Sequence, residues 1–164
     1  MEDNTNIKLI TKEGKEIELS KKAAELSEVL KATINDFPNE TNFPLNEIDE
    51  KIAEKMKEYL THFNGVAPKE IEKPLTQNEM KNLTDEWSTN FIDKLTLEEL
   101  VNLTVAANSM GINCLLDLCS AKIASMCKDK SQDEILKTFG ITEKFTEEEK
   151  KKIKEENKWI DENL

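Results

Sequence analysis

The amino-acid sequence predicts an α+β fold in which a β-hairpin precedes a chain that is otherwise mostly helical. Near the start, two short segments alternate apolar and polar residues on either side of a turn that contains glycine, as strands with one buried face do. Later segments repeat apolar residues every three or four positions, as amphipathic helices do. Three matches to the capping box, which starts helices, lie in the second half of the chain, so we expect only helices there.

The hairpin is predicted from Ile7–Ile10 and Glu16–Leu19, with Gly14 in the loop between them. A further short extended piece is predicted at Phe43–Leu45. Its Pro44 confines this piece to the edge of a sheet or the end of a strand, because proline has no N–H to donate to a neighbouring strand.

Two helices are predicted in the first half of the chain. Ser20 is a suitable N-cap for the first helix, and residues 36–42, with Pro38, interrupt its pattern. The apolar residues of this helix recur at helical spacing and are Ala23, Leu26, Val29, Leu30 and Ile34. The apolar face of the second helix consists of Ile52, Met56, Tyr59, Leu60 and Phe63.

Residues 64–82 have no sustained hydrophobic period and contain Gly65, Pro68 and Pro74, so we expect an exposed connector. The later helices begin at capping boxes, in which a hydroxyl accepts a free backbone N–H and an acid three residues on reaches back. These boxes pair Thr96 with Glu99, Ser131 with Glu134, and Thr146 with Glu149. Gly111 and Gly140 are expected at helix ends.

Composition limits the classes of partner. The chain has 164 residues, of which 37% are hydrophobic and 35% charged, so we expect one domain with a modest core. Its net charge of -11 argues against binding to nucleic acid or to an anionic membrane. No apolar run is long enough for a membrane span, and the acidic start is unlike a signal peptide. The expected location is therefore the cytoplasm and nucleus.

Residue types that carry catalysis or bind metals are scarce. His62 is the only histidine, which excludes sites built from several histidines, and it is expected to cap a helix or lie on the surface. Cys114, Cys119 and Cys127 fall in one helical stretch and are expected to be small buried hydrophobes, neither disulfide-bonded nor metal-bound. No glycine-rich loop precedes a helix. We therefore expect no enzymatic activity, no cofactor and no metal. A concave pocket with a strongly perturbed pair of acids would contradict this.

The last helix, which begins after Thr146, consists almost entirely of Glu and Lys but carries Ile153, Trp159 and Ile160. Most helical stability in proteins comes from burying one face, and this apolar stripe is too narrow for that. A tryptophan at the end of such a helix indicates a surface that is completed by another protein. Ion pairs four residues apart, Glu147 with Lys151 and Glu148 with Lys152, are expected to support the helix.

Five short runs stand in an informative order and spacing: Asp85–Phe91, Ala106–Ile112, Leu115–Asp117, Lys137–Ile141 and Glu155–Trp159. Together they resemble the Skp1 family, the adaptor subunits of cullin-RING (SCF) ubiquitin ligases. The resemblance covers nearly the whole chain. Proteins similar to elongin C share the earlier part, a BTB/POZ fold, but end before the last two helices. The presence of Ser131–Trp159 therefore favours the Skp1 family.

The resemblance implies a BTB/POZ fold, a small sheet flanked by helices, with additional C-terminal helices. The implied parts are an N-terminal BTB/POZ portion (1–64), the connector (65–82), the remaining BTB/POZ helices (83–128) and the F-box-binding helices (129–164). The implied function is that of a non-catalytic adaptor, which bridges the N-terminal region of a cullin to F-box substrate receptors for protein ubiquitination. A weak homodimer of the free chain is also expected.

The resemblance places mostly apolar residues against the F-box: Leu100, Val101, Thr104, Leu116, Cys119, Ile123, Cys127, Phe139, Ile141 and Trp159. Trp159 is the expected energetic anchor, because aromatic residues dominate such interfaces. The alternative is that Trp159 packs the last helix onto its own domain. The domain's own core is expected to take Leu103, Ala106, Ala107 and Leu115.

Cullin binding is implied for Asn108 and Ser109, but Ser109 stands where a tyrosine is usual in the family, and the ring's contact area is lost. Either the cullin differs to match, or it binds weakly. Glu147 occupies the place of a proline that is hydroxylated and glycosylated in some protist relatives, so that modification cannot occur here. The acidic insertion usual before Pro44 is shortened to Pro38–Asn42.

A second hypothesis also fits the sequence. The chain could be a self-associating BTB/POZ scaffold, or an adaptor like elongin C, without F-box binding. Homodimerisation in the absence of any F-box partner would favour the scaffold.

Overall fold

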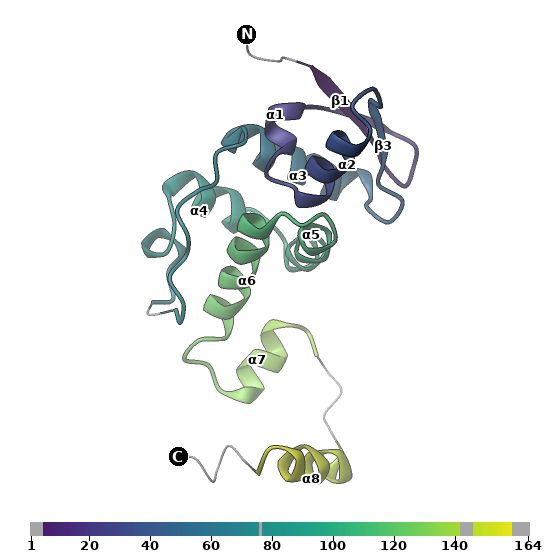
Figure 1. Ribbon diagram of the computed structural model, residues 1–164. Coiled ribbons are helices and arrows are strands. Elements are labelled where there is room, and N and C mark those ends of the chain that lie inside the picture. Colours follow the sequence, from purple (N-terminus) through teal and green to yellow (C-terminus); the bar gives the residue numbers. More distant parts are fainter. Residues whose placement is uncertain (1–4, 76, 142–145, 159–164) are drawn as a thin grey trace. The chain divides into compact units, whose positions relative to one another are not determined.

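The computed structural model describes residues 5–75, 77–141 and 146–158 (Figure 1). The chain divides into two compact units, which we call unit 1 (residues 1–128) and unit 2 (residues 129–164). Among the helices formed by the described residues, none combines the length and the apolar character that a bilayer crossing requires.

Unit 1 contains a three-stranded sheet in the order β2-β1-β3. The strands are β1 (Asn6–Ile10), β2 (Glu16–Ser20) and β3 (Asn42–Pro44). The central strand, β1, pairs antiparallel with β2 and parallel with β3, so that Leu9 lies opposite both Ile17 and Phe43. The predicted hairpin is confirmed, and β3 is an edge strand that ends in proline, as predicted.

The alternation of polarity in the strands has the expected result. Ile7 and Leu9 of β1, and Ile17 and Leu19 of β2, are buried in the core. On the opposite face Lys8 forms an exposed ion pair with the carboxylate of Glu16 at 2.7 Å. The sheet therefore has one buried face, and its apolar residues form part of the core of unit 1.

Two helices, α1 (Lys21–Ala24) and α2 (Glu28–Asp36), occupy the region where the sequence predicts one continuous helix. Ser20 caps α1, as predicted. The continuous helix is wrong because Ser27 is buried and starts a new helix. Its hydroxyl caps α2 and donates a hydrogen bond to the carbonyl of Met110 at 2.6 Å. The break thus depends on a residue 83 positions away, which local spacing does not reveal.

The second predicted helix is confirmed as α3 (Glu50–Phe63). Near its end the exposed ring of His62 stacks on Trp87, with ring centroids 3.7 Å apart and planes 3° from parallel. His62 is therefore a surface residue, as predicted. Its stacking partner was not predicted, because Trp87 belongs to a helix 25 positions further along the chain.

The connector after α3 leads to a short 3₁₀ turn, η1 (Met80–Asn82). Most of the connector's described residues are exposed, but Ile71 and Met80 are buried. The ammonium group of Lys73 lies 2.8 Å from the carboxylate of Asp117. The connector is therefore held against unit 1 by apolar anchors and by an ion pair, which its irregular sequence does not reveal.

Three longer helices complete unit 1: α4 (Glu86–Asp93), α5 (Leu97–Ser109) and α6 (Asn113–Cys127). Helices α5 and α6 pack against each other (Figure 1). The predicted capping box of α5 is confirmed. The N–H of Thr96 donates to the carboxylate of Glu99 at 2.7 Å, and the N–H of Glu99 donates to the Thr96 hydroxyl at 3.2 Å.

Unit 2 contains α7 (Gln132–Thr138) and α8 (Glu147–Glu156). The capping boxes that begin at Ser131 and Thr146 are both present, as predicted, and Gly140 follows α7 with a positive φ of 66°. None of the described residues in this unit is buried.

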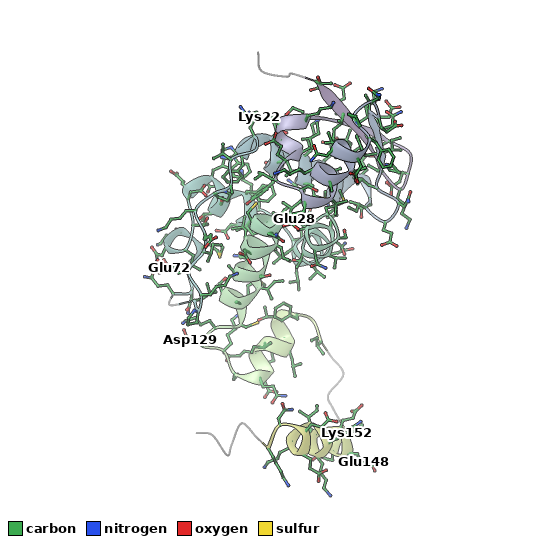
Figure 2. The ribbon with its side chains drawn as sticks, viewed as in Figure 1. Lys22, Glu28, Glu72, Asp129, Glu148 and Lys152 are labelled. Atoms are coloured by element: carbon green, nitrogen blue, oxygen red, sulfur yellow. The ribbon has the colours of Figure 1, made fainter. Side chains whose placement is uncertain are left out.

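The charged residues of α8 pair differently from the expectation. Lys150 binds Glu147 at 2.7 Å, and Lys152 lies 3.9 Å from Glu156. The side chains of Glu148 and Lys152, on the same helix, are exposed (Figure 2). Exposed pairs of this kind stabilise a helix only slightly, so they cannot replace a buried face.

Candidate partner-binding surfaces

Helix α5 has one buried face and one exposed apolar stripe. The buried face consists of Leu100, Leu103, Ala106 and Ala107. The exposed stripe contains Val101 and Val105, whose exposed fractions are 43% and 64%. The prediction that Leu103, Ala106 and Ala107 belong to the domain's own core is confirmed, as it is for Leu115 of α6.

The predicted F-box residues of α5 differ in their surroundings. Leu100 is buried within unit 1, Thr104 is half-buried, and Val101 is exposed. The hydroxyl of Thr104 donates to the carbonyl of Leu100 at 2.6 Å, which satisfies the hydroxyl within the helix. Val101 and Thr104 are therefore available at the surface of unit 1, and Leu100 supports them from beneath.

On α6 the half-buried members of the predicted set are Leu116, Ile123 and Cys127. They are seven and four residues apart, a spacing that places them on one face of a helix. Leu116 and Ile123 also pack against the core of unit 1. This face is thus partly covered by unit 1 and partly open.

Cys119 of α6 is a predicted F-box residue that interacts with another one, Thr104 of α5. It is completely buried, and this burial raises the pKa of its thiol to about 12, against which a hydrogen bond with Thr104 of α5 acts weakly. Cys119 is therefore a neutral, small core residue, as predicted, and it lies beneath the surface that the other residues form. The same prediction is wrong for Cys114 and Cys127, which are only half-buried.

The predicted cullin-binding residues, Asn108 and Ser109, are exposed at the end of α5. The Ser109 hydroxyl donates to the carbonyl of Ala106 at 3.0 Å. Just beyond them the chain is tied to α2, because the N–H of Glu28 donates to the carbonyl of Gly111 at 3.1 Å. The side chain of Glu28, which Figure 2 labels, also accepts a hydrogen bond from the Asn113 amide at 2.8 Å. The end of α5 is therefore held in place by hydrogen bonds between the chain that follows it and Glu28 of α2.

The remaining predicted F-box residues belong to unit 2. Phe139 ends α7 and is half-buried, and Ile141 is 50% exposed. Ile153 of α8 is also exposed, at 42%. Trp159, the expected anchor, lies outside the described residues. Unit 2 thus presents apolar side chains with no core of its own among its described residues to cover them.

Val105 is an exposed apolar residue that the predicted sites omit. It is four residues after Val101 and four before Ser109, so the three side chains lie along one face of α5. This spacing is the sequence signal that could have placed Val105 on the predicted surface. The stripe runs from the predicted F-box residues to the predicted cullin residues.

An acidic hollow of about 650 Å³ lies elsewhere in unit 1, and its lining includes Glu13, Glu50, Glu54, Glu98 and Glu99. The capping bonds from Thr96, together with Lys51 at 3.0 Å, lower the pKa of Glu99 to about 2. Glu99 is therefore ionised at neutral pH and cannot serve as a proton donor. Within the described ranges no three His, Cys, Asp or Glu side chains are grouped so that they could hold a metal ion.

Two family models match the chain. Residues 5–65 match the tetramerisation domain of the Skp1 family, and residues 113–160 match the dimerisation domain of the same family. The first match spans the sheet and α3, and the second spans α6 and the described helices of unit 2.

Full-length relatives are also similar to this chain. It is 40% identical over 159 residues to the S-phase kinase-associated protein 1 homolog of Tetrahymena thermophila, covering 97% of this chain and 96% of the relative. It is 31% identical over 157 residues to the E3 ubiquitin ligase complex SCF subunit sconC of Arthroderma benhamiae, covering 95% of each chain. The sconC subunit of Neosartorya fischeri is likewise 31% identical, over 96% of this chain and 99% of the relative.

Proposed function

This chain belongs to the Skp1 family, and from that premise we propose that it is the adaptor of an SCF-type cullin-RING ubiquitin ligase. It bridges the N-terminal region of a cullin to F-box substrate receptors. Its work is to set the distance between a bound substrate and the ubiquitin-charged enzyme that the ligase recruits.

The observation that carries this proposal is the lack of buried residues in unit 2. Its described helices have capping boxes and exposed apolar side chains, but no buried face. Helices of seven and ten residues are marginal in water without tertiary packing. A partner that covers these side chains would supply the missing burial, and an F-box is the partner that the family implies.

We propose further that the adaptor role is non-catalytic. The acidic hollow of unit 1 contains an acid, Glu99, that is committed to capping α5 and to an ion pair with Lys51. Glu99 is held in its ionised form there, because its pKa is lowered to about 2. It therefore cannot be the protonated member of the acid pair that catalysis by two carboxyl groups requires.

Calorimetric titration of the full chain with a purified F-box protein tests F-box binding. Trp159→Ala should weaken binding by about 2 kcal/mol or more, since aromatic anchors dominate interfaces. Ile141→Ala removes three carbon groups, each worth about 0.8 kcal/mol when taken fully out of water. Because Ile141 is 50% exposed in the free chain, docking buries only about half of this area, and the variant should weaken binding by about 1 kcal/mol. Val66→Ala is the matched control, because Val66 is exposed (69%) but lies on unit 1 outside the predicted surface.

Unchanged affinity for both unit 2 variants would remove unit 2 from the F-box site. A chain that forms homodimers but binds no F-box protein at all would replace the adaptor by the self-associating scaffold.

Cullin binding is tested at Ser109. A tyrosine ring in this exposed position would add contact area without entering the core of unit 1. Ser109→Tyr should therefore raise the affinity for the N-terminal region of a cullin that carries the family's usual surface about tenfold, which is about 1.4 kcal/mol. Equal or lower affinity of the variant for the cullin from the same organism would show that this cullin has adapted to serine.

A further inference from the structure

A cavity of about 200 Å³ lies in unit 1, beneath the connector. Its lining comes from α3, the connector, the start of α4 and the first turns of α6, and includes Tyr59, Ile71, Ser88, Cys114 and Asp117. None of the residues predicted to bind an F-box or a cullin lines it. The cavity is therefore separate from the surfaces to which the proposed function applies.

Tyr59 contributes an unusual polar atom to this region. The residue is completely buried, and its ring packs against Phe63, Trp87 and Phe91, with centroid distances of 4.8, 6.1 and 5.7 Å. Its hydroxyl is buried and makes no hydrogen bond of ordinary geometry within the described part of the chain. Buried hydroxyls nearly always have a partner, so this exception calls for an explanation.

Cys114 lines the same cavity as Tyr59. Burial is the main cause that raises the pKa of Tyr59, and interaction with Cys114 is the next. A thiol is only a weak acceptor, so the hydroxyl remains a donor whose capacity is poorly used. An oxygen atom bonded to the sulfur of Cys114 would be a much stronger acceptor at the same place.

Cys114 also differs from the other two cysteines. It is a free, half-buried thiol at the wall of the cavity, and it lies in the first turn of α6, where no side chain caps the free backbone N–H groups. Cys119 is fully buried, and Cys127 is half-buried at the far end of α6, away from the cavity.

We propose that Cys114 is a site of reversible oxidation by hydroperoxides, and that the Tyr59 hydroxyl holds the oxygen that is added. The sulfur attacks one oxygen of the peroxide, an S–O bond forms and the O–O bond breaks. Sulfur loses two electrons, and the peroxide is reduced to water or to an alcohol, which takes up the thiol proton. The product is a sulfenic acid, whose oxygen accepts a hydrogen bond from Tyr59.

No second cysteine of the same chain is placed to resolve this product. Cys127 is 13 residues further along α6, which corresponds to about 20 Å along a helix. Cys119 is enclosed in the core. The sulfenic acid therefore persists until a small external thiol condenses with it and a second thiol releases Cys114 in its reduced form.

The test treats the full-length protein with hydrogen peroxide, traps sulfenic acid with a dimedone probe, and counts the modified cysteines by mass spectrometry. In the unmodified sequence Cys114 should be trapped at least about five times as much as Cys127, which is the internal control. Tyr59→Phe keeps the ring and removes the hydroxyl. It should lower the trapped fraction of Cys114 about fivefold, the ratio that corresponds to one hydrogen bond of ordinary net strength, and leave Cys127 unchanged.

Equal trapping of Cys114 and Cys127 in the unmodified sequence would overturn the proposal, and that comparison needs no variant to fold. Unchanged trapping of Cys114 in a folded Tyr59→Phe protein would overturn the role of the hydroxyl. Binding of F-box proteins by the reduced chain is measured separately, so failure here leaves the adaptor function untouched.

Discussion

At Gly65 the chain leaves α3 in a conformation that other residues rarely adopt, with φ at +83°. A Cβ added there would lie 2.7 Å from the carbonyl oxygen of Lys22, the residue that Figure 2 labels on α1. This oxygen belongs to the backbone, so it cannot rotate away as a flexible side chain would. Gly65 is thus required twice, by its backbone angle and by its close approach to α1.

We predict that Gly65→Ala destabilises the protein by about 3 kcal/mol, of which the left-handed backbone accounts for about 1 and the steric overlap for the rest. Gly14→Ala is the matched control. Gly14 has nearly the same φ, +82°, but open space around the added methyl group. That variant should therefore lose only about 1 kcal/mol. Urea denaturation of both variants measures the difference, and equal losses would show that α1 moves aside.

Single residues were predictable where their partners are close in sequence. Thr96 and Glu99 form the expected capping box because both atoms that bond belong to one helical turn. The break at Ser27 and the shared cavity of Tyr59 and Cys114 were not predictable, because each depends on residues brought near by the fold. Trp159 lies outside the residues that the structure describes, so its role as the anchor for the F-box stays a prediction.

At the scale of one element, the capping box gives α5 a measurable pH dependence. The carboxyl of Glu99 has a pKa of about 2 in the folded chain, below its ordinary value of 4.5, because the N–H of Thr96 and the ammonium of Lys51 favour its ionised form. A carboxyl whose pKa is lowered on folding stabilises the protein above the ordinary pKa. That stabilisation is lost as the pH falls from about 4.5 towards 2.

We therefore predict that Glu99→Gln lowers the free energy of unfolding at pH 7, and that the gap to the unmodified sequence narrows steadily below pH 4.5. Glu98→Gln is the control, since Glu98 also lies in the first turn of α5 but takes no part in the capping box. Its gap should stay small at every pH. Urea midpoints measured at several pH values provide the comparison, and a constant gap for Glu99→Gln would contradict the prediction.

Elements were predictable to different degrees. The hairpin and the capped helices follow from periodicity and from hydroxyl and acid residues at fixed spacing, which act locally. The connector was predicted as exposed from its composition, yet Ile71 and Met80 are buried. The apolar residues of the connector have no period. An irregular segment can bury a side chain at any position where the segment meets a groove, so its pattern does not show which residues are buried.

At the scale of the molecule, the two units differ in what stabilises them. Unit 1 has a continuous core that joins the sheet to its helices, whereas no described residue of unit 2 is buried. We predict that backbone amides of α7 and α8 exchange with deuterium much faster than those of α5 and α6 in the free protein, because exchange protection follows burial and packing.

Adding an F-box protein should slow exchange in α7 and α8 and leave the sheet of unit 1 unchanged, which serves as the internal control. Hydrogen–deuterium exchange followed by mass spectrometry measures both states. Protection of α7 and α8 in the free protein at the level of α6 would contradict the prediction, because it would mean that unit 2 is already packed.

The residues of the candidate surfaces were predicted from the runs that resemble the family. Which of these residues are buried was not predicted. The sequence could not distinguish Leu100 and Cys119, which are buried, from Val101 and Ile123, which reach the surface. Both kinds are apolar and share the helical period, so only packing separates them. Val101 and Val105 form a second apolar stripe that is visible in the sequence, but Val105 was left out of the predicted site. Resemblance to a family does not show which side chains are exposed.

The exposed apolar residues of unit 2 have a consequence for how ligase assemblies turn over. Part of the free energy of docking goes into ordering the segment that docks, typically about 2–5 kcal/mol for coupled folding and binding. Complexes formed in this way bind more weakly than their contact area suggests. A limited pool of this adaptor could then be redistributed among many receptors as the abundance of each one changes.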